Sequence, residues 1–414
     1  MPGKVPYRTQ IDLGELAFKC SCPSRKFPCK HGLGLYLLHA GNPALFATAE
    51  TPAWVADWLA GRRGRREKKE EKATAQSAPA TPEDAAAAAA QARKREDKRK
   101  DKREQNIARG LAELQTWLED LARNGLASVR ERGPGYWETI AARMVDAQAS
   151  GLAARLRRVS SLCFQSTNPH WEEQLGGELA ALYLLSHAYG RLGQLPRALQ
   201  SDVRIQTGWT VPQEEVLAQP ALPDCWQVVA QATTDEGRLR ARATWLRGNT
   251  SGRWALLLHY AAGGQGFEVP LATGTEFDAE LCFYPSAFPL RALVKQSSGL
   301  RALAGAAPAA PTLDAALDGY AAALAAQPFL ERYPLLLSGA PDLADSRVFN
   351  TADGRRLTLN ASFHHRRHLL ALSGGHPLTL VGEWDGASLL PLSAWHDGRL
   401  FNFETDFGAS DLTP

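Results

Sequence analysis

Three cysteines and a histidine lie within twelve residues near the amino end of this 414-residue chain. One residue separates Cys20 from Cys22, six residues follow, and one residue separates Cys29 from His31. Deprotonated sulfur and imidazole are the ligands that tetrahedral zinc prefers. Each close pair can hold one side of an ion, and the connection between the pairs is long enough for the chain to turn back. The spacing therefore predicts a zinc site.

The predicted ion has a structural role, because four protein ligands leave no open position for water. The apolar run at 33–38 predicts a helix that ends at Gly41-Asn42-Pro43. The positive end of that helix would face the thiolates and stabilise their charge. The alternative, a disulfide or a set of buried thiols, is disfavoured because the chain is long and has no secretory signal.

The pattern Cys-x-Cys, gap, Cys-x-His resembles the SWIM-type zinc finger. The resemblance implies one structural Zn²⁺ held by Cys20, Cys22, Cys29 and His31, a short strand within Tyr7–Leu13, and a helix at the second ligand pair. The whole chain is similar to bacterial SWIM zinc finger proteins with long C-terminal regions. This similarity implies zinc binding and a role in binding DNA or protein.

Length and composition predict a multidomain α+β protein. At 414 residues with 44% hydrophobic residues, the chain is long enough for two or three domains with real cores. We predict a SWIM finger module at 1–61, a charged low-complexity linker at 62–104, a helical bundle or array at 105–222, and an antiparallel β-rich region with a helical insertion at 223–414.

The predicted linker differs sharply in charge from the rest of the chain. It carries fifteen Lys and Arg against nine Asp and Glu, whereas the whole chain has a net charge of only +3. With six consecutive alanines at 85–90 and little to bury, it is expected to be disordered or loosely helical. Its basic clusters could touch nucleic acid, and the alternative is a solvated spacer.

Hydrophobic periodicity separates the two regions that follow. Three- and four-residue spacing predicts helices over 105–200, including 172–192 and 196–206. Period-two patterns predict strands beyond residue 225, in an open barrel or a pair of sheets, with an Ala-rich helix at Thr312–Gln327. The predicted strands are Gln227–Ala232, Leu239–Leu246, Trp254–Tyr260, Phe267–Leu271, Phe277–Tyr284, Arg356–Ala361, Leu369–Leu372, Leu378–Trp384 and Leu389–Trp395.

The sequence also bears on the cellular compartment of the protein and on where its natural chain begins. No apolar stretch suits a signal peptide or a membrane span of about 20 residues. We therefore expect a cytoplasmic protein in which the isolated Cys163, Cys225 and Cys282 are buried reduced thiols. Because Met1-Pro2-Gly3-Lys4 is typical of the middle of a turn, we expect either that the natural start lies upstream or that the chain is a short form.

The remaining patterns do not indicate catalysis. His364-His365-Arg366-Arg367-His368 is predicted to be an exposed basic turn, since strand-like sequence flanks it. No combination of nucleophile, base and oxyanion donor is evident, and no pattern indicates a small-molecule substrate.

The sequence therefore predicts a non-enzymatic, zinc-binding interaction protein. Its finger would present Arg25, Lys26 and Lys30 to a nucleic acid or a protein partner. The alternative is a protein–protein scaffold in which the finger is purely structural and the helical and β regions carry the partner surface. A third hypothesis, an enzyme with its site in the β region, would be favoured by a deep polar pocket there.

Overall fold

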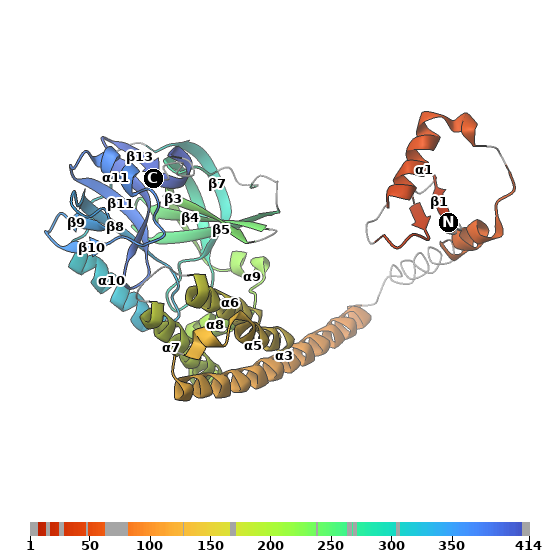
Figure 1. Cartoon of the computed structure of the whole chain (residues 1–414), viewed down its shortest axis with the longest axis horizontal. Coiled ribbons are helices and arrows are strands. Elements are labelled where there is room, and N and C mark those ends of the chain that lie inside the picture. Colours follow the sequence, from red (N-terminus) through yellow and green to blue (C-terminus); the bar gives the residue numbers. More distant parts are fainter. Residues whose placement is uncertain are drawn as a thin grey trace. The chain divides into compact units, whose positions relative to one another are not determined.

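A computed structural model covers the whole chain, and it describes residues 7–13, 17–24, 29–46, 49–62, 82–126, 128–165, 171–236, 239–262, 267, 271–303 and 307–407. The chain divides into two compact units, Met1–Lys98 and Arg99–Pro414. The fold is multidomain α+β, as predicted from the sequence, with a small amino-terminal module, a helical region and antiparallel sheets (Figure 1).

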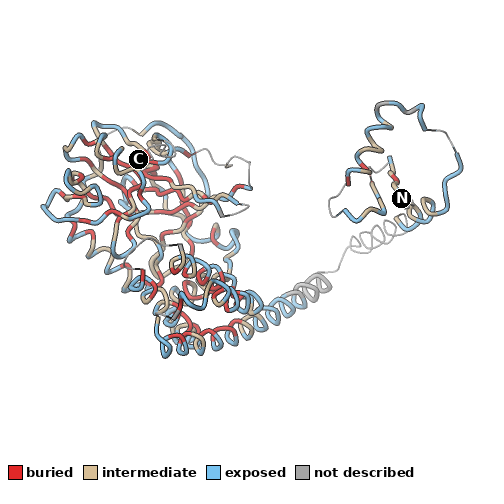
Figure 2. Tube along the Cα trace, in the orientation of Figure 1, coloured by how far each residue is buried: buried red, intermediate tan, exposed pale blue. Residues whose placement is uncertain are grey.

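The first unit is built on a small hairpin and one helix. Strand β1 (Thr9–Asp12) pairs antiparallel with β2 (Ala17–Cys20), and Thr9 lies opposite Cys20. Helix α1 (Lys30–Gly41) packs on both strands and leads into the short 3-10 helix η1 (Pro43–Leu45). A further helix covers residues 53–62. Figure 2 shows few buried positions in this unit.

The helical region surrounds one apolar core. From residue 107 onward, the long helix α3 (Pro82–Asn124) turns one isoleucine and four leucines toward the core at three- and four-residue spacing. The other helices of this region are α4 (Ser128–Glu131), α5 (Pro134–Asp146), α6 (Ser150–Gln165), α7 (Trp171–Gly190), η2 (Leu192–Gln194), α8 (Arg197–Thr207) and α9 (Gln213–Leu217). Trp137 of α5 and Leu156 of α6 are among the fully buried side chains at their contact.

Two antiparallel sheets follow. The first has the order β5-β4-β3-β6-β7, and the second has the order β10-β9-β8-β11-β12-β13. The strands of the first sheet are β3 (Ala221–Glu236), β4 (Leu239–Gly248), β5 (Trp254–Ala262), β6 (Thr275–Phe283) and β7 (Ala292–Ala302). Those of the second sheet are β8 (Tyr333–Pro341), β9 (Val348–Thr351), β10 (Arg356–Thr358), β11 (Leu378–Trp384), β12 (Leu389–His396) and β13 (Arg399–Asn402).

The sheets pack against each other through apolar side chains such as Trp245, Val381 and Trp395. The other face of the second sheet shares a core with α10 (Leu313–Ala326), α11 (Arg366–Ser373) and α12 (Phe403–Asp406). The first sheet curls around a core of its own that includes Trp226 and Phe277. The sequence predicted either an open barrel or a pair of sheets. The structure has two sheets, and one of them is partly rolled into a barrel.

Buried polar groups also join the two sheets. The Ser393 hydroxyl donates to the Val229 carbonyl, and the Asn402 amide donates to the Gln231 carbonyl at 3.0 Å. Both acceptors lie in β3 and both donors lie in the C-terminal strands. Because an unpaired buried polar group is costly, these bonds fix one alignment of the sheets.

The helical region is tied to the β region within the second unit. Asp202 of α8 is buried, and its carboxylate accepts the backbone N–H of Ala287 at 2.8 Å. The Gln206 amide donates to the Phe329 carbonyl at 3.2 Å. Burial raises the pKa of Asp202, although hydrogen bonds from Ser286, Ala287 and Gln327 partly offset the effect.

The sequence predictions for strands and helices are mostly met, with four differences. The segment 364–368 is not an exposed turn, because Arg366–His368 begin α11 and both Arg366 and His368 are partly covered. The predicted strand Leu369–Leu372 is wrong, because this segment lies in α11. The ends of Phe267–Leu271 are not in a strand, and its middle lies outside the described residues. Strands β2, β7, β8, β9 and β13 were not predicted. The boundaries at 61, 104 and 222 stay predictions; the residues on either side of 104 lie in one continuous helix, α3.

A glycine substitution tests the contact between α6 and α8. A Cβ at Gly151 would meet the Gln206 carbonyl oxygen and lie 2.9 Å from the Gly208 nitrogen. Gly151→Ala should therefore lower the free energy of unfolding by about 1–3 kcal/mol, measured by urea denaturation. The control is Gly135→Ala, also at the second residue of its helix but with nothing within 4 Å of the new Cβ. Equal effects of the two substitutions would contradict this packing.

Candidate metal centre

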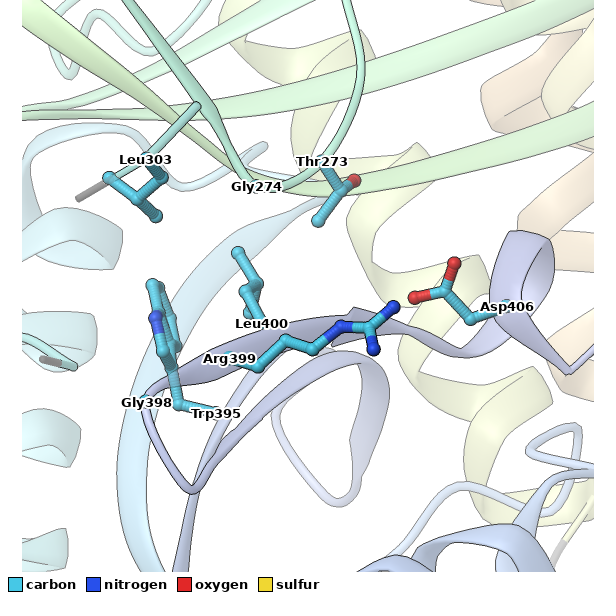
Figure 3. A pocket seen from close by; sticks show the side chains of 8 residues that line it. All are labelled: Thr273, Gly274, Leu303, Trp395, Gly398, Arg399, Leu400 and Asp406. Atoms are coloured by element: carbon cyan, nitrogen blue, oxygen red, sulfur yellow. The ribbon is translucent and has the colours of Figure 1, made fainter. Parts of the chain in front are cut away.

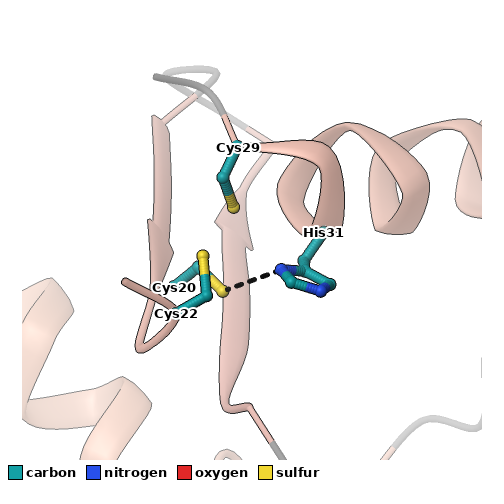
Figure 4. Close-up of side chains that lie close together, drawn as sticks. All are labelled: Cys20, Cys22, Cys29 and His31. Carbon is teal, nitrogen blue, oxygen red and sulfur yellow. Dashed lines mark hydrogen bonds between the residues drawn. The ribbon is translucent and has the colours of Figure 1, made fainter. Parts of the chain in front are cut away.

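The four predicted ligands are brought together by three short pieces of backbone. Cys20 is the last residue of β2, and Cys22 lies in the turn that follows. Cys29 is the N-cap residue of α1, and His31 lies in the first turn of this helix. The side chains of the hairpin end and the helix start point toward one another (Figure 4).

The ligand atoms have a spacing close to that of a tetrahedral site. One nitrogen or sulfur atom from each of the four residues lies within 4.8 Å of all the others. The distance from Cys20 Sγ to His31 Nδ1 is 3.9 Å. Zinc–sulfur bonds of about 2.3 Å would place tetrahedral ligand atoms about 3.8 Å apart. Only a small contraction would therefore close the four side chains around an ion.

Hydrogen bonds reach two of the sulfurs. The Thr9 hydroxyl lies 3.1 Å from Cys20 Sγ. This hydrogen bond is the largest of the interactions that together lower the pKa of the Cys20 thiol to about 7. The backbone N–H of Gly32 donates to Cys29 Sγ at 3.5 Å, as an N-cap interaction of α1. The start of the helix thus directs an N–H group and its dipole at the cluster.

The third sulfur shows why a cation fits here. The backbone N–H of Ser24 favours the Cys22 thiolate, but burial and the neighbouring Cys20 and Cys29 sulfurs outweigh it and raise the pKa of Cys22. Three thiolates this close repel one another in the absence of a positive charge. A Zn²⁺ ion removes that repulsion, and the closed set of one imidazole and three sulfurs suits a structural site.

Aromatic rings flank the centre. The Tyr7 ring lies 5.1 Å from the His31 ring, centroid to centroid. Phe18 packs edge-on against Tyr36 of α1 at 6.1 Å. A Cβ on Gly32 would come within 3.2 Å of the Phe18 ring, so the absence of a side chain lets α1 approach β2 closely.

The structure brings the four predicted ligands together but does not describe all of the predicted contact residues. Cys20, Cys22, Cys29 and His31 converge, whereas the predicted contact residues Arg25 and Lys26 lie outside the described residues. The third contact residue, Lys30, is exposed at the first turn of α1. Sequence reasoning missed Thr9, whose hydroxyl reaches Cys20 only because β1 and β2 pair in this register.

The other cysteines do not join the cluster. Cys163 and Cys282 are buried free thiols, as predicted. The prediction is wrong for Cys225, which is only half-buried, because its side chain lies beside the exposed Arg301 guanidinium at 3.1 Å. Burial raises the pKa of Cys225, so it is not an activated thiol.

A polar hollow in the β region bears on the enzyme hypothesis. It has a volume of about 270 Å³ and lies between the β12–β13 hairpin and the Thr273–Gly274 turn (Figure 3). Arg399 points toward Asp406 across it. The Asp406 carboxylate accepts the backbone N–H of Asn402 at 2.9 Å, which gives it a structural role. The described residues that line the hollow do not place a nucleophile beside a base.

Two family models match parts of the chain. Residues 7–39 match the SWIM zinc finger, and residues 102–207 match the SWIM-associated four-helix bundle domain. No curated protein and no solved structure matches the chain. The predicted SWIM-type finger is confirmed, and the match together with the Cys3His cluster supports a structural zinc ion. Both matched domains are of kinds that are typically non-catalytic, and together they indicate a zinc-binding interaction module. Among the described residues, no helix has both the length and the apolar character needed to span a membrane.

Replacing one ligand should remove the metal. Cys22→Ser is expected to lower the zinc content from about one ion per chain to less than a tenth, because a hydroxyl is a poor zinc ligand. Elemental analysis measures the zinc, and hydrogen exchange should show lost protection in β1, β2 and α1 with the second unit unchanged. Cys225→Ser is the control and should keep its zinc. A Cys22→Ser protein with full zinc and a protected α1 would refute the ligand assignment.

A second substitution tests the support given by Thr9. Thr9→Val keeps the shape of the side chain but removes the hydroxyl that bonds to Cys20. The zinc affinity should fall by about tenfold, since partners of metal ligands typically contribute this much. Competition with a chromogenic chelator measures the affinity, with the exposed Thr51→Val as the control. An affinity equal to that of the wild type would show that the hydroxyl does not support the ligand.

Proposed function

We propose that this chain is a zinc-binding interaction protein whose finger docks another protein through the outer face of α1. The observation that carries the proposal is a row of exposed leucines on this helix. Leu33, Leu37 and Leu38 are 44%, 67% and 58% exposed. A soluble protein gains nothing from exposing neighbouring apolar side chains on one short helix unless they meet a partner.

The arrangement of α1 explains how zinc would serve this function. Cys20, Cys22, Cys29 and His31 coordinate the ion and fix the start of the helix on the hairpin. Gly32 and Tyr36 face Phe18, whereas Leu33 and Leu37, four residues apart, share an exposed side about 100° away around the helix. The ion thereby holds one face inward and presents the other. Lys30 lies beside the leucines and, with Arg25 and Lys26, would add positive charge at the edge of the contact.

A second candidate function, nucleic-acid binding, is supported by α3. Residues 93–103 of this helix include eight Lys and Arg but only three Asp and Glu. Apart from the partly exposed Arg103, every residue in this stretch is exposed. A basic helix of this kind can neutralise phosphates without reading sequence. The basic stretch would add nonspecific affinity to whatever the finger binds.

The leucine face is tested by a charge substitution. Leu37→Asp should abolish recovery of the finger's partners from a native cell lysate treated with nuclease, because a buried carboxylate cannot be accommodated in an apolar contact. The control is Leu343→Asp, which charges a 75% exposed leucine of the second unit. Both variants should keep one zinc per chain. Unchanged recovery with Leu37→Asp would favour the alternative scaffold, in which the finger is purely structural and the helical and β regions carry the partner surface.

Salt dependence tests the nucleic-acid candidate. If α3 contacts about five phosphates, the affinity for a fluorescent 30-base-pair DNA should fall on the order of 10²–10³-fold between 50 and 200 mM salt. Replacing Arg93, Lys94 and Arg95 by Gln should weaken binding and flatten the slope in fluorescence anisotropy. Replacing Arg132, Arg143 and Arg191, exposed arginines of the helical region, is the matched control. A slope that the first triple variant leaves unchanged would exclude this part of α3.

A further inference from the structure

The first sheet of the β region is almost a closed barrel, but its edges join at only one end. The Leu256 N–H donates to the Leu290 carbonyl at 2.8 Å, and Leu256 forms a parallel bridge with Arg291. Beyond this point β5 and β7 run on as the two edge strands, and the described residues show no further ladder between them. The two edges therefore separate beyond this bridge and leave an opening between them, which residues of both strands line.

A groove of about 600 Å³ occupies this opening. Its walls come from the two edge strands, and its floor comes from Leu271 and Phe277, which belong to the core inside the curled sheet. The apolar lining residues are Leu257, Leu258, Leu271, Phe277, Ala292, Leu293, Val294 and Leu300. A groove of this volume and composition is typical of sites for small apolar ligands.

One end of the groove is basic. His259 lines it, and Arg242 lies directly opposite His259 in the ladder between β4 and β5. Residues opposite each other in a ladder project from the same face of the sheet. Arg240 lies two residues along β4, so it shares that face. The Arg242 guanidinium lies 4.0 Å from the Phe267 ring centroid, and Arg240 lies 5.3 Å from the same centroid.

Arg242 has no acidic partner in the part of the chain that the structure describes. The side chain is half-buried, and among the residues that the structure describes it forms no ion pair with a carboxylate. Stacking on Phe267 orients the guanidinium but leaves its N–H donors available. A half-buried arginine with free donors is a natural partner for a carboxylate, which it can bind in a bidentate manner.

We propose that the groove between β5 and β7 binds a free long-chain carboxylate, with its hydrocarbon chain over Leu271 and Phe277 and its carboxylate at Arg242. The apolar floor selects an alkyl chain, and the basic end selects an anionic head group. A neutral hydrocarbon would leave the arginine without a partner, and a small hydrophilic anion would leave the apolar walls exposed to water. This site is independent of the zinc centre, because all its residues lie in the second unit.

The proposal is tested on the full chain with cis-parinarate, a fluorescent polyene carboxylate. Its fluorescence should rise on binding and saturate at one molecule per chain. Alkanoates should displace it about tenfold more weakly for each two methylenes removed, because each methylene contributes to burial. Tetradecanol should compete at least tenfold more weakly than tetradecanoate.

Variants distinguish this groove from general hydrophobic binding. Arg242→Gln should weaken tetradecanoate by about tenfold and leave tetradecanol unchanged, because only the acid uses the guanidinium. Val294→Trp should weaken both ligands by filling the groove. Arg253→Gln is the matched control, because Arg253 also stacks on a phenylalanine of this sheet, at 4.6 Å from the Phe283 ring centroid. Thermal melting of each variant confirms that the β region is folded.

Four results would overturn the proposal. The first is no saturable parinarate signal with a folded wild-type chain. The second is equal loss of binding with Arg242→Gln and Arg253→Gln. The third is binding only to phosphatidylglycerol vesicles and not to monomeric carboxylate, which would assign the groove to a membrane surface. The fourth is displacement of parinarate by an extended peptide but not by tetradecanoate. The groove would then bind a peptide as an added strand along the edge of β5 or β7.

Discussion

The convergence of three sulfurs and one imidazole is the interaction on which the first unit depends. Among its described residues, the only buried hydrophobic side chains are Ala17 and Cys29, and Cys29 is itself part of the cluster. Cation–π contacts, such as Arg8 over Trp54 at 5.9 Å, lie at the surface and add little. A unit with so small an apolar interior cannot offset the entropy of folding by burial. Folding of this unit is therefore coupled to metal binding.

The second unit is stabilised in a different way, because it buries large apolar cores. Trp245 joins the two sheets by both packing and hydrogen bonding. Its ring is fully buried between the sheets, and its indole N–H donates to Glu383 at 2.8 Å. Arg332 donates to the same carboxylate at 3.3 Å. The acid, the indole and the guanidinium satisfy one another, so polar atoms at the sheet interface cost little. Loss of zinc should consequently leave this unit intact.

The sequence was informative where side-chain chemistry or period decided the structure locally. The Cys and His spacing predicted the metal cluster, and the leucine period predicted the core face of α3. The sequence prediction failed at α11, because Leu369–Leu372 is compatible with either a strand or a helix. Gly374, in the left-handed conformation that commonly ends a helix, was the signal for the helix, but the strands predicted on both sides favoured a strand. Strand β7 was missed because most of its residues are exposed and the polar run at 295–298 interrupts any apolar alternation. The bond from Thr9 to Cys20 depends on strand register, which no single-sequence pattern reports.

The hydrogen bonds between the sheets have a consequence for how the chain is made. The Gln231 carbonyl accepts its hydrogen bond from the Asn402 side chain, and the Thr233 N–H donates to Glu404 at 2.7 Å. In each pair the partners are 171 residues apart in the sequence. On a ribosome, β3 is complete long before these partners emerge. On that flank, the central strand of the first sheet therefore lacks its hydrogen-bond partners until residues 402–404 have been synthesised. A ribosome that stalls near residue 390 would hold a nascent chain whose two sheets are only partly paired and therefore prone to aggregate. Synthesis of Asn402 and Glu404 is the step that supplies the missing hydrogen-bond partners of β3.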